Sequence, residues 1–208
     1  NLREIMVTIK DVAKKAGFSV DTVSAVINGA PIVSPKAKEK ILEAIKELGY
    51  RPNAIARSLK NAKTSSIGII LRDITNPHYS EIVSGLEEIA WTNNYEVFLC
   101  NTENSLEREL KYIDNLMNKR VDGIVIATSS LKREQYYDKL RMFGIPYVFL
   151  NRRPEELFDY ECYVGGDNRL ASVKVIDHLY QLGYSRIAYL GGPINFSTFH
   201  ERLSGFLE

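Results

Sequence analysis

The first fifty residues carry the hydrophobic spacing of three short helices, at residues 9–16, 20–27 and 35–48. Gly17 and Gly49, which follow the first and the third of these, are residues that commonly end a helix. A residue whose hydroxyl can cap a helix precedes each one: Thr8, Ser19 and Ser34. The pattern therefore predicts a compact head in which two helices are joined by a tight turn and a third packs beneath them.

From residue 67 onward the spacing changes, and short apolar runs alternate with amphipathic stretches. The apolar runs predict strands at residues 67–71, 96–101, 123–127, 147–150, 163–164 and 187–190. The amphipathic stretches predict helices at residues 79–92, 106–118, 132–143 and 168–182, and one that begins near Phe199. Such alternation predicts a parallel sheet covered by helices on both faces, with the last helix barely begun at Glu208.

A short polar segment joins the two patterns. Asn53 can cap a brief helix at residues 54–59, and the polar run that follows has the composition of a linker. Charge follows the same division: Lys and Arg outnumber Asp and Glu by 11 to 5 in residues 6–63, but are outnumbered by 20 to 15 in residues 64–208. A basic head on an acidic body is expected of a protein whose one end neutralises phosphates.

Composition argues against several other classes of protein. The 45% hydrophobic content supports a packed core, no apolar run approaches the roughly 20 residues of a membrane span, and the first residues lack a signal peptide, which together predict a cytoplasmic protein. Cys100 and Cys162 fit no metal spacing and are expected to be reduced thiols in the core. No phosphate-cradling or nucleophile motif is present, so we expect no enzyme, cofactor or bound metal. We assign no role to residues 1–5.

The two short helices and their turn have the chemistry of a DNA-reading helix-turn-helix, which places the start of its second helix in the major groove. Short hydrogen-bonding side chains that can reach phosphates occur in and beside the second helix: Ser19, Thr22, Ser24 and Asn28. Cations that add salt-sensitive affinity lie around them: Lys10, Lys14, Lys36 and Lys38. Taken alone, the segment also fits a small helical interaction module with solvated lysines.

Polar side chains follow several predicted strands, at the edge where parallel sheets bind ligands. They form three groups: Asp73, Asn76 and Tyr79 after the first strand, Asn151, Arg152 and Arg153 after the fourth, and Asp167 with Asn168 after the fifth. Carboxylates, amides and arginine pair with hydroxyls, and an aromatic ring can cover a sugar face. Each residue also has a plain structural alternative, as a turn residue, a helix cap or a surface charge. Their convergence favours a binding pocket.

Motifs spread over nearly the whole chain resemble the lactose/galactose repressor (LacI/GalR) family. In the head they are Thr-Ile-Lys-Asp-Val-Ala from Thr8, Ala-Gly-Phe-Ser from Ala16, Thr-Val-Ser-Ala-Val-Ile-Asn-Gly from Thr22 and Leu-Gly-Tyr-Arg-Pro-Asn from Leu48. Beyond the head they are Ala-Arg-Ser-Leu-Lys ending at Lys60, Ile-Gly-Ile-Ile from Ile67 and Arg-Val-Asp-Gly-Ile from Arg120. The resemblance implies a DNA-binding transcriptional repressor that acts on a near-palindromic operator as a homodimer.

The same resemblance implies an all-α helix-turn-helix head and an α/β periplasmic-binding-protein-like sensor core. The expected parts are the head at 6–52, a hinge helix and linker at 53–66, a first sensor subdomain at 67–165 and the start of a second at 166–208. Because the family continues well past this point, we expect the chain to be a fragment with an incomplete second subdomain.

For DNA recognition, the resemblance implies that Val20, Asp21 and Ala25 face bases. Ala25 and Val20 suit thymine methyl groups, whereas Asp21 can accept a hydrogen bond from a cytosine amino group. Leu59 takes the place of the hinge leucine that enters the minor groove, the alternative being an ordinary packing leucine. The predicted contacts also include Thr8, Ile9 and Lys60.

For the effector, the resemblance rests on Gly-Gly-Pro from Gly191, the following Phe-Ser-Thr, and Glu-Arg-Leu-Ser-Gly-Phe from Glu201. It implies that Arg202 anchors a small polar effector, a sugar or sugar phosphate, with Ser197 or Thr198 beside it. The alternative for Arg202 is a salt-bridge partner on the helix surface. The alternative for the whole body is control by a protein coregulator in place of a small molecule.

Overall fold

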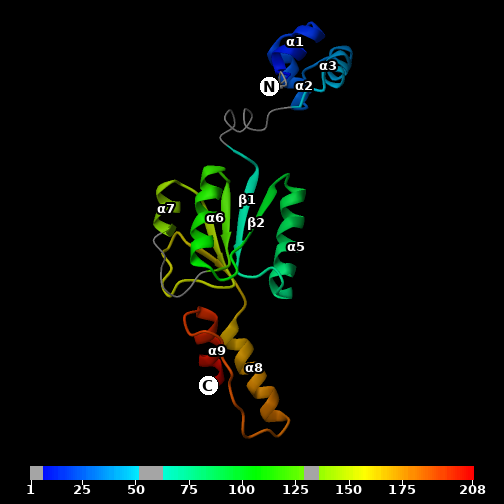
Figure 1. Ribbon diagram of the computed structural model, residues 1–208. Coiled ribbons are helices and arrows are strands. Elements are labelled where there is room, and N and C mark those ends of the chain that lie inside the picture. The colour runs from blue at the N-terminus through cyan, green and yellow to red at the C-terminus, as the bar shows by residue number, and fades with distance from the viewer. Residues whose placement is uncertain (1–6, 52–62, 129–135) are drawn as a thin grey trace. The chain divides into compact units, whose positions relative to one another are not determined.

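The computed structural model describes residues 7–51, 63–128 and 136–208 (Figure 1). The chain divides into two compact units, residues 1–62 and residues 63–208. Each unit has its own hydrophobic core.

The head consists of three helices, as the spacing predicts. They are α1 (Ile9–Ala16), α2 (Val20–Ile27) and α3 (Pro35–Leu48). Their apolar faces meet in one core, in which Val12, Val23 and Ile41 are fully buried. Gly17 and Gly49 end α1 and α3 with positive φ angles of 74° and 61°, which residues with a side chain rarely adopt. Local capping and the shared core therefore produce the helix-turn-helix arrangement.

The described residues of the second unit contain one parallel sheet. Its strands are β1 (Ser66–Leu71), β2 (Glu96–Asn101), β3 (Gly123–Ile126), β4 (Tyr147–Leu150) and β5 (Cys162–Val164). They lie in the order β2-β1-β3-β4-β5, and every neighbouring pair is parallel. Leu71 is opposite Asn101 and Ile70 is opposite Ile126, so the strands end at one edge of the sheet. We name the residues that directly follow β1 to β4, which are 72–76, 102–105, 127–128 and 151–154, the carboxyl edge.

Helices cover both faces of the sheet (Figure 1). They are α5 (Pro77–Thr92), α6 (Leu106–Asn118) and α7 (Tyr136–Met142). Ile69 and Leu71 pack with α5, whereas Ile70 packs with α6 and α7, because successive side chains of a strand point to opposite faces. Gly68 allows α6 to approach β1, since a Cβ at this position would lie 2.5 Å from Cδ1 of Leu116. Burial on both faces explains why the strands are continuous apolar runs in the sequence.

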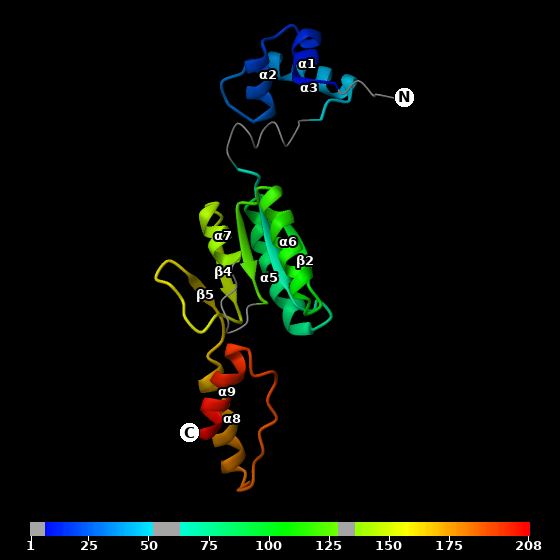
Figure 2. The same ribbon diagram turned by 60° about the vertical axis from the view of Figure 1, so that its left-hand side comes forward.

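The last part of the chain forms a pair of helices, α8 (Asn168–Gln181) and α9 (Ser197–Leu207), which lie side by side in both views (Figures 1 and 2). Their contact leaves no room for a side chain at Gly205. A Cβ there would lie 2.2 Å from the carbonyl oxygen of Arg169 and 2.9 Å from Cβ of Ser172. This glycine therefore determines how closely the two helices approach.

Three expectations about this unit are wrong. Residues 187–190 form no strand, because no strand lies beside them in the described part of the chain, and Tyr189 packs instead against Phe199 and Phe206 of α9. The final helix, expected only to begin, runs for 11 residues. Cys162 is exposed on the edge strand β5, whereas Cys100 is buried in β2, where burial raises the pKa of its thiol to about 11.

Other predicted elements are confirmed with small shifts at their ends. The helix expected from residue 79 begins at Pro77, because Asn76 caps it and a proline suits the first helical position. The brief helix predicted at 54–59 and the start of the helix predicted at 132–143 lie outside the described residues. Within the described residues, every helix is too short or too polar to cross a membrane.

Candidate functional site

The start of α2 is preorganised by its own side chains. Ser19 caps the helix, since its Oγ accepts a hydrogen bond from the backbone N–H of Thr22 at 3.2 Å and lies 2.8 Å from the Thr22 hydroxyl. At the other end, Nδ2 of Asn28 donates to Oγ of Ser24 at 3.3 Å. These residues, all predicted to contact phosphates, thus hold each other in place in two pairs, one at each end of α2.

The residues expected to face bases differ in exposure. Val20 and Asp21 are exposed in the first turn of α2, with Val20 at 37%, and Ala25 one turn later is half-buried. The four lysines expected to meet phosphates are all exposed: Lys10, Lys14, Lys36 and Lys38. The first turn of α2 therefore presents a small apolar group and a carboxylate on a basic head.

Thr8 and Ile9 stabilise the start of α1. The backbone N–H and the hydroxyl of Thr8 both donate to Oδ2 of Asp11, at 2.8 and 2.7 Å, and these hydrogen bonds hold the pKa of Asp11 below its usual value. Ile9 packs against the head core. Both residues thus have structural roles, and their predicted contacts to DNA stay predictions, as do those of Leu59 and Lys60, which lie outside the described residues.

In the second unit, three of the predicted effector residues stabilise local backbone turns. The carboxylate of Asp73 accepts hydrogen bonds from the backbone N–H and hydroxyl of Thr75, at 2.9 and 2.7 Å, which lower the pKa of Asp73. Asn76 caps α5 and Asp167 caps α8, with Oδ1 of each accepting a backbone N–H at 3.1 and 2.8 Å. These are the structural alternatives that the sequence left open.

The aromatic ring at the carboxyl edge is not the predicted one. Tyr79 is only 5% exposed, packs in the core against β1, and its hydroxyl donates to the carbonyl oxygen of Ala127 at 3.5 Å. Phe196, just before α9, instead lies against two guanidinium groups. Its ring centroid is 3.8 Å from Cζ of Arg152 and 4.8 Å from Cζ of Arg72. A residue from the last part of the chain thereby reaches the end of the sheet.

Arg152 is the most unusual charge in this region. Its Nε and Nη1 are buried and have no hydrogen-bond partner among the described residues. Burial lowers the pKa of the guanidinium to about 10; nearby Tyr79 acts in the opposite direction, and the charges of Arg72 and Arg202 lower it further. The group nevertheless remains charged at neutral pH.

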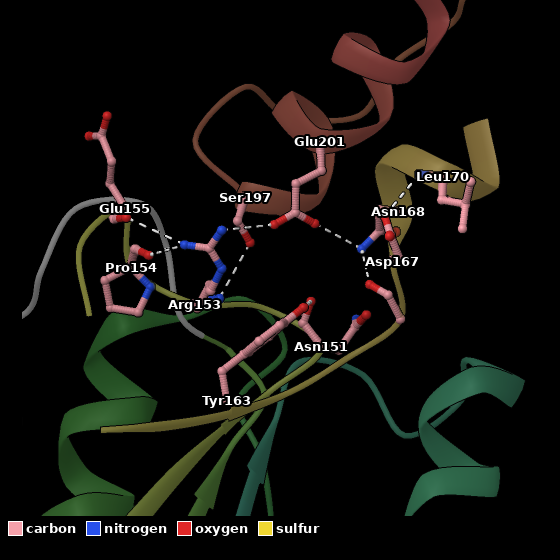
Figure 3. Close-up of polar contacts among 11 residues, drawn as sticks. Asn151, Arg153, Pro154, Glu155, Tyr163, Asp167, Asn168, Leu170, Ser197 and Glu201 are labelled. Carbon is pink, nitrogen blue, oxygen red and sulfur yellow. Dashed lines mark hydrogen bonds and ion pairs between the residues drawn. The ribbon is translucent and has the colours of Figure 1, made fainter. Parts of the chain in front are cut away.

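A polar network joins the carboxyl edge to α8 and α9 (Figure 3). Nη2 of Arg153 lies 3.3 Å from one carboxylate oxygen of Glu201, and Nδ2 of Asn168 donates to the other at 3.0 Å. The backbone N–H of Arg153 donates to Oγ of Ser197 at 3.3 Å. Asn168 in turn accepts a hydrogen bond from Nε of Arg202 at 2.8 Å. We name Arg153, Ser197, Glu201, Asn168 and Arg202 the Glu201 network.

The three residues that the resemblance assigns to effector binding, Ser197, Thr198 and Arg202, differ in their exposure to solvent. Ser197 and Thr198 are 3% and 8% exposed, whereas Arg202 is exposed and lines a groove of about 430 Å³ between α8, residues 187–190 and α9. Ser197 and Arg202 both belong to the Glu201 network, and Thr198 is buried next to Ser197 in the sequence.

Several residues of this site were missed by the sequence analysis: Arg72, Thr102, Thr128, Phe196 and Glu201. Thr102 is the first residue after β2 and Thr128 is the second residue after β3, so the same rule that selected Asp73 would have found them. Their hydroxyls are buried and unpaired within the described residues. Glu201 has no comparable signal, because a glutamate on an amphipathic helix usually faces solvent. Within the described residues no cluster of three histidine, cysteine or carboxylate side chains could hold a metal ion.

Comparison with known families matches both units of the chain. Residues 8–53 match bacterial regulatory proteins of the lacI family, and residues 64–208 match the periplasmic binding proteins and sugar binding domain of the LacI family.

Curated relatives include the ribose operon repressor of Halalkalibacterium halodurans, 39% identical over 98% of this chain and 59% of its own length. Catabolite control protein A of Priestia megaterium is 37% identical over 91% of this chain and 57% of its own length. The chain thus spans about three fifths of the length of these relatives, which are transcriptional regulators and not enzymes.

Solved structures lead to the same family. The lac repressor bound to ONPG in its repressed state matches 97% of this chain, which covers 61% of that structure, with a TM-score of 0.80 and 29% identity. The lac repressor dimer bound to operator and the anti-inducer ONPF matches 97% of this chain, which covers 60% of that structure, with a TM-score of 0.78 and 27% identity. Because the helix-turn-helix head, the parallel sheet and the sequence matches all agree, this chain belongs to the LacI family of bacterial regulatory proteins.

Proposed function

We propose that this protein is a sequence-specific DNA-binding regulator that represses transcription in the cytoplasm. Each head reads one half of a near-palindromic operator in double-stranded DNA, and two copies bind as a homodimer. The family match and the exposed first turn of α2 support this role. The lac repressor dimer, a similar structure, was solved bound to its operator.

We assign the reading of bases to Val20, Asp21 and Ala25 and the contacts with phosphates to the residues around them. Thr8, Ile9, Ser19, Thr22, Ser24 and Asn28 complete this surface. In the hinge, Leu59 enters the minor groove and Lys60 meets the backbone. Small apolar side chains at two of the three reading positions favour a half-site rich in thymine methyl groups.

The regulator responds to a small polar effector, of the sugar or sugar phosphate class, at the carboxyl edge. One observation carries this proposal. Within the described residues, the buried side-chain nitrogen and oxygen atoms without a partner belong to Thr102, Thr128 and Arg152, which follow β2, β3 and β4. Because buried polar groups are normally hydrogen-bonded, atoms left unpaired at one edge of a parallel sheet are suited to a ligand.

We include the other predicted residues in this site with more specific roles. Arg202 and Ser197 contact the effector from α9, next to Thr198. Asp73, Asn76, Tyr79 and Asp167 keep the surrounding turns, helix starts and core in place.

Selection of duplex DNA from a random pool tests the regulatory role. We expect a near-palindromic sequence to be enriched, and sedimentation to show two copies of the protein on it. Its affinity is expected to fall steeply with salt, because phosphate contacts release counterions. A pool without an enriched motif, or one copy bound to an asymmetric site, would contradict the proposal.

Replacing Ala25 with arginine is expected to change the preferred base at one position of each half-site toward guanine. The reason is that arginine can donate two hydrogen bonds to guanine, worth about 1–3 kcal/mol of discrimination, whereas alanine can only touch a methyl group. The measurement is a repeat of the selection with the Ala25→Arg variant. Lys36→Ala serves as the control, since loss of a phosphate contact lowers affinity for all sequences alike. An unchanged base preference would remove Ala25 from the reading surface.

A further inference from the structure

The guanidinium of Arg152 is a half-buried cation that lacks a counterion. Two of its nitrogens are buried without a hydrogen-bond partner, and it forms no ion pair with any residue that the structure describes. The ring of Phe196 lies 3.8 Å from its Cζ, which offers a cation–π contact. Such a contact compensates a charge only in part, because the ring carries no net charge.

The hydrogen bonds that the structure gives to the carboxylates of Glu201 and Asp73 come from groups other than Arg152. Both oxygens of Glu201 are directed at other partners, one at Arg153 and one at Asn168 (Figure 3). Asp73 accepts its two hydrogen bonds from Thr75. Other guanidinium groups, by contrast, lie close enough for their charges to disfavour the charged form of Arg152. The carboxyl edge therefore has an excess of positive charge.

The excess positive charge at the carboxyl edge favours some classes of ligand over others. A charge taken out of water without a partner is unfavourable, and the groups that compensate arginine best are carboxylates and phosphates. A neutral sugar hydroxyl can accept a hydrogen bond from Arg152 but leaves the charge uncompensated. An anionic group supplies both the acceptor and the opposite charge.

We propose that the effector of this protein carries an anionic group, either a phosphate ester or a carboxylate, which pairs with Arg152. The inference rests on the proposed effector site and narrows its ligand class. Arg72, which shares Phe196 with Arg152, and Arg202 add to the positive potential felt by the anion. The unpaired hydroxyls of Thr102 and Thr128 are left for neutral polar groups of the same molecule.

Inorganic phosphate is the minimal probe for this anion site. We expect millimolar phosphate to raise the unfolding temperature of the wild type above that in sodium chloride of equal ionic strength. The rise should disappear in Arg152→Gln, persist in part in Arg152→Lys, and remain in Arg186→Gln, an exposed arginine outside the site. The lysine variant keeps the test valid if the glutamine variant folds poorly. Equal responses of wild type and Arg152→Gln, or no response of the wild type, would overturn the proposal.

A second set of ligands distinguishes a phosphate from a carboxylate effector, and a wrong ligand class from the absence of an effector site. Glucose, gluconate and glucose 6-phosphate present a neutral, a carboxylate and a phosphate group on related skeletons, and calorimetry compares them. We expect one of the anions to bind at least ~10-fold more tightly than glucose, the order given by one charge-assisted hydrogen bond. Glucose binding as tightly as both anions would overturn the anionic assignment but keep the effector site. Operator binding that persists while no phosphate or sugar binds would refute the effector site and, with it, this inference.

Discussion

Gly205→Ala is expected to lower the free energy of unfolding of the second unit by up to about 2 kcal/mol, because forcing an extra group into a packed contact typically costs about 1–3 kcal/mol. Alanine is favoured over glycine in a helix by about 1 kcal/mol, so helix propensity alone predicts stabilisation. The steric term prevails because the new Cβ would lie 2.2 Å from the carbonyl oxygen of Arg169, a backbone atom that cannot move away as a flexible side chain can.

Urea unfolding followed by circular dichroism measures this effect. Ser204→Ala is the matched control, since Ser204 is exposed on the same helix and its replacement brings a better helix former without a clash. An unfolding free energy that is equal to or above that of the wild type would mean that α8 and α9 can separate without cost. In that case Gly205 would not determine how closely the two helices approach.

Glu201→Ala is expected to disconnect the carboxyl edge from α9. The side chains of Arg153 and Glu201 are 31% and 23% exposed, so their pair is shielded from water more than a surface ion pair. Removal of the carboxylate leaves Arg153 without its ion pair and Nδ2 of Asn168 without one of its two acceptors. We expect the free energy of unfolding to fall by about 1–3 kcal/mol, the cost of leaving partly buried polar groups unpaired.

Hydrogen exchange at a single amide distinguishes this connection from general destabilisation. The backbone N–H of Arg153 donates to Ser197, so its exchange should accelerate in Glu201→Ala more than that of amides within β1. Glu201→Gln retains a hydrogen-bond acceptor for Asn168 but has no charge. The exchange rate of the Arg153 amide in this variant should lie between the rates in the wild type and in Glu201→Ala. The exposed Glu156→Ala serves as the control. Equal acceleration at Arg153 and throughout β1 would assign Glu201 a role in stability alone.

A structural feature can be predicted best from the sequence where it depends on residues a few positions apart. The three head helices, α6, β2 and β4 have the bounds expected from their spacing. Ser19 also caps its helix as expected. A helix start or a strand is specified by hydrogen bonds and by the period of apolar residues within one short segment, and both are visible in the sequence.

A feature is hardest to predict from the sequence where it depends on a neighbour far along the chain. The apolar alternation at residues 187–190 predicts a strand, but a strand also needs another strand beside it, and α9 is the neighbour that Tyr189 has. Cys162 was placed in the core because its burial was inferred from residue type alone, without knowledge that β5 lies at an edge. Tyr79 was predicted to lie in the effector pocket, where an aromatic ring can cover a sugar face. The packing of α5 against the sheet buries this ring in the core.

The sequence by itself determined the family, the helix-turn-helix head, the alternation of strands and helices, and the edge of the sheet at which polar residues gather. Only the tertiary structure decided which of those polar residues are already satisfied. Asp73 and Asp167 find their partners two or three residues away, whereas Arg153 finds Glu201 at a separation of 48 residues. Arg152 finds no anion among the described residues. The physical reason is that a hydrogen bond or a charge is satisfied in space, and the chain reveals in advance only those partners that are close in sequence.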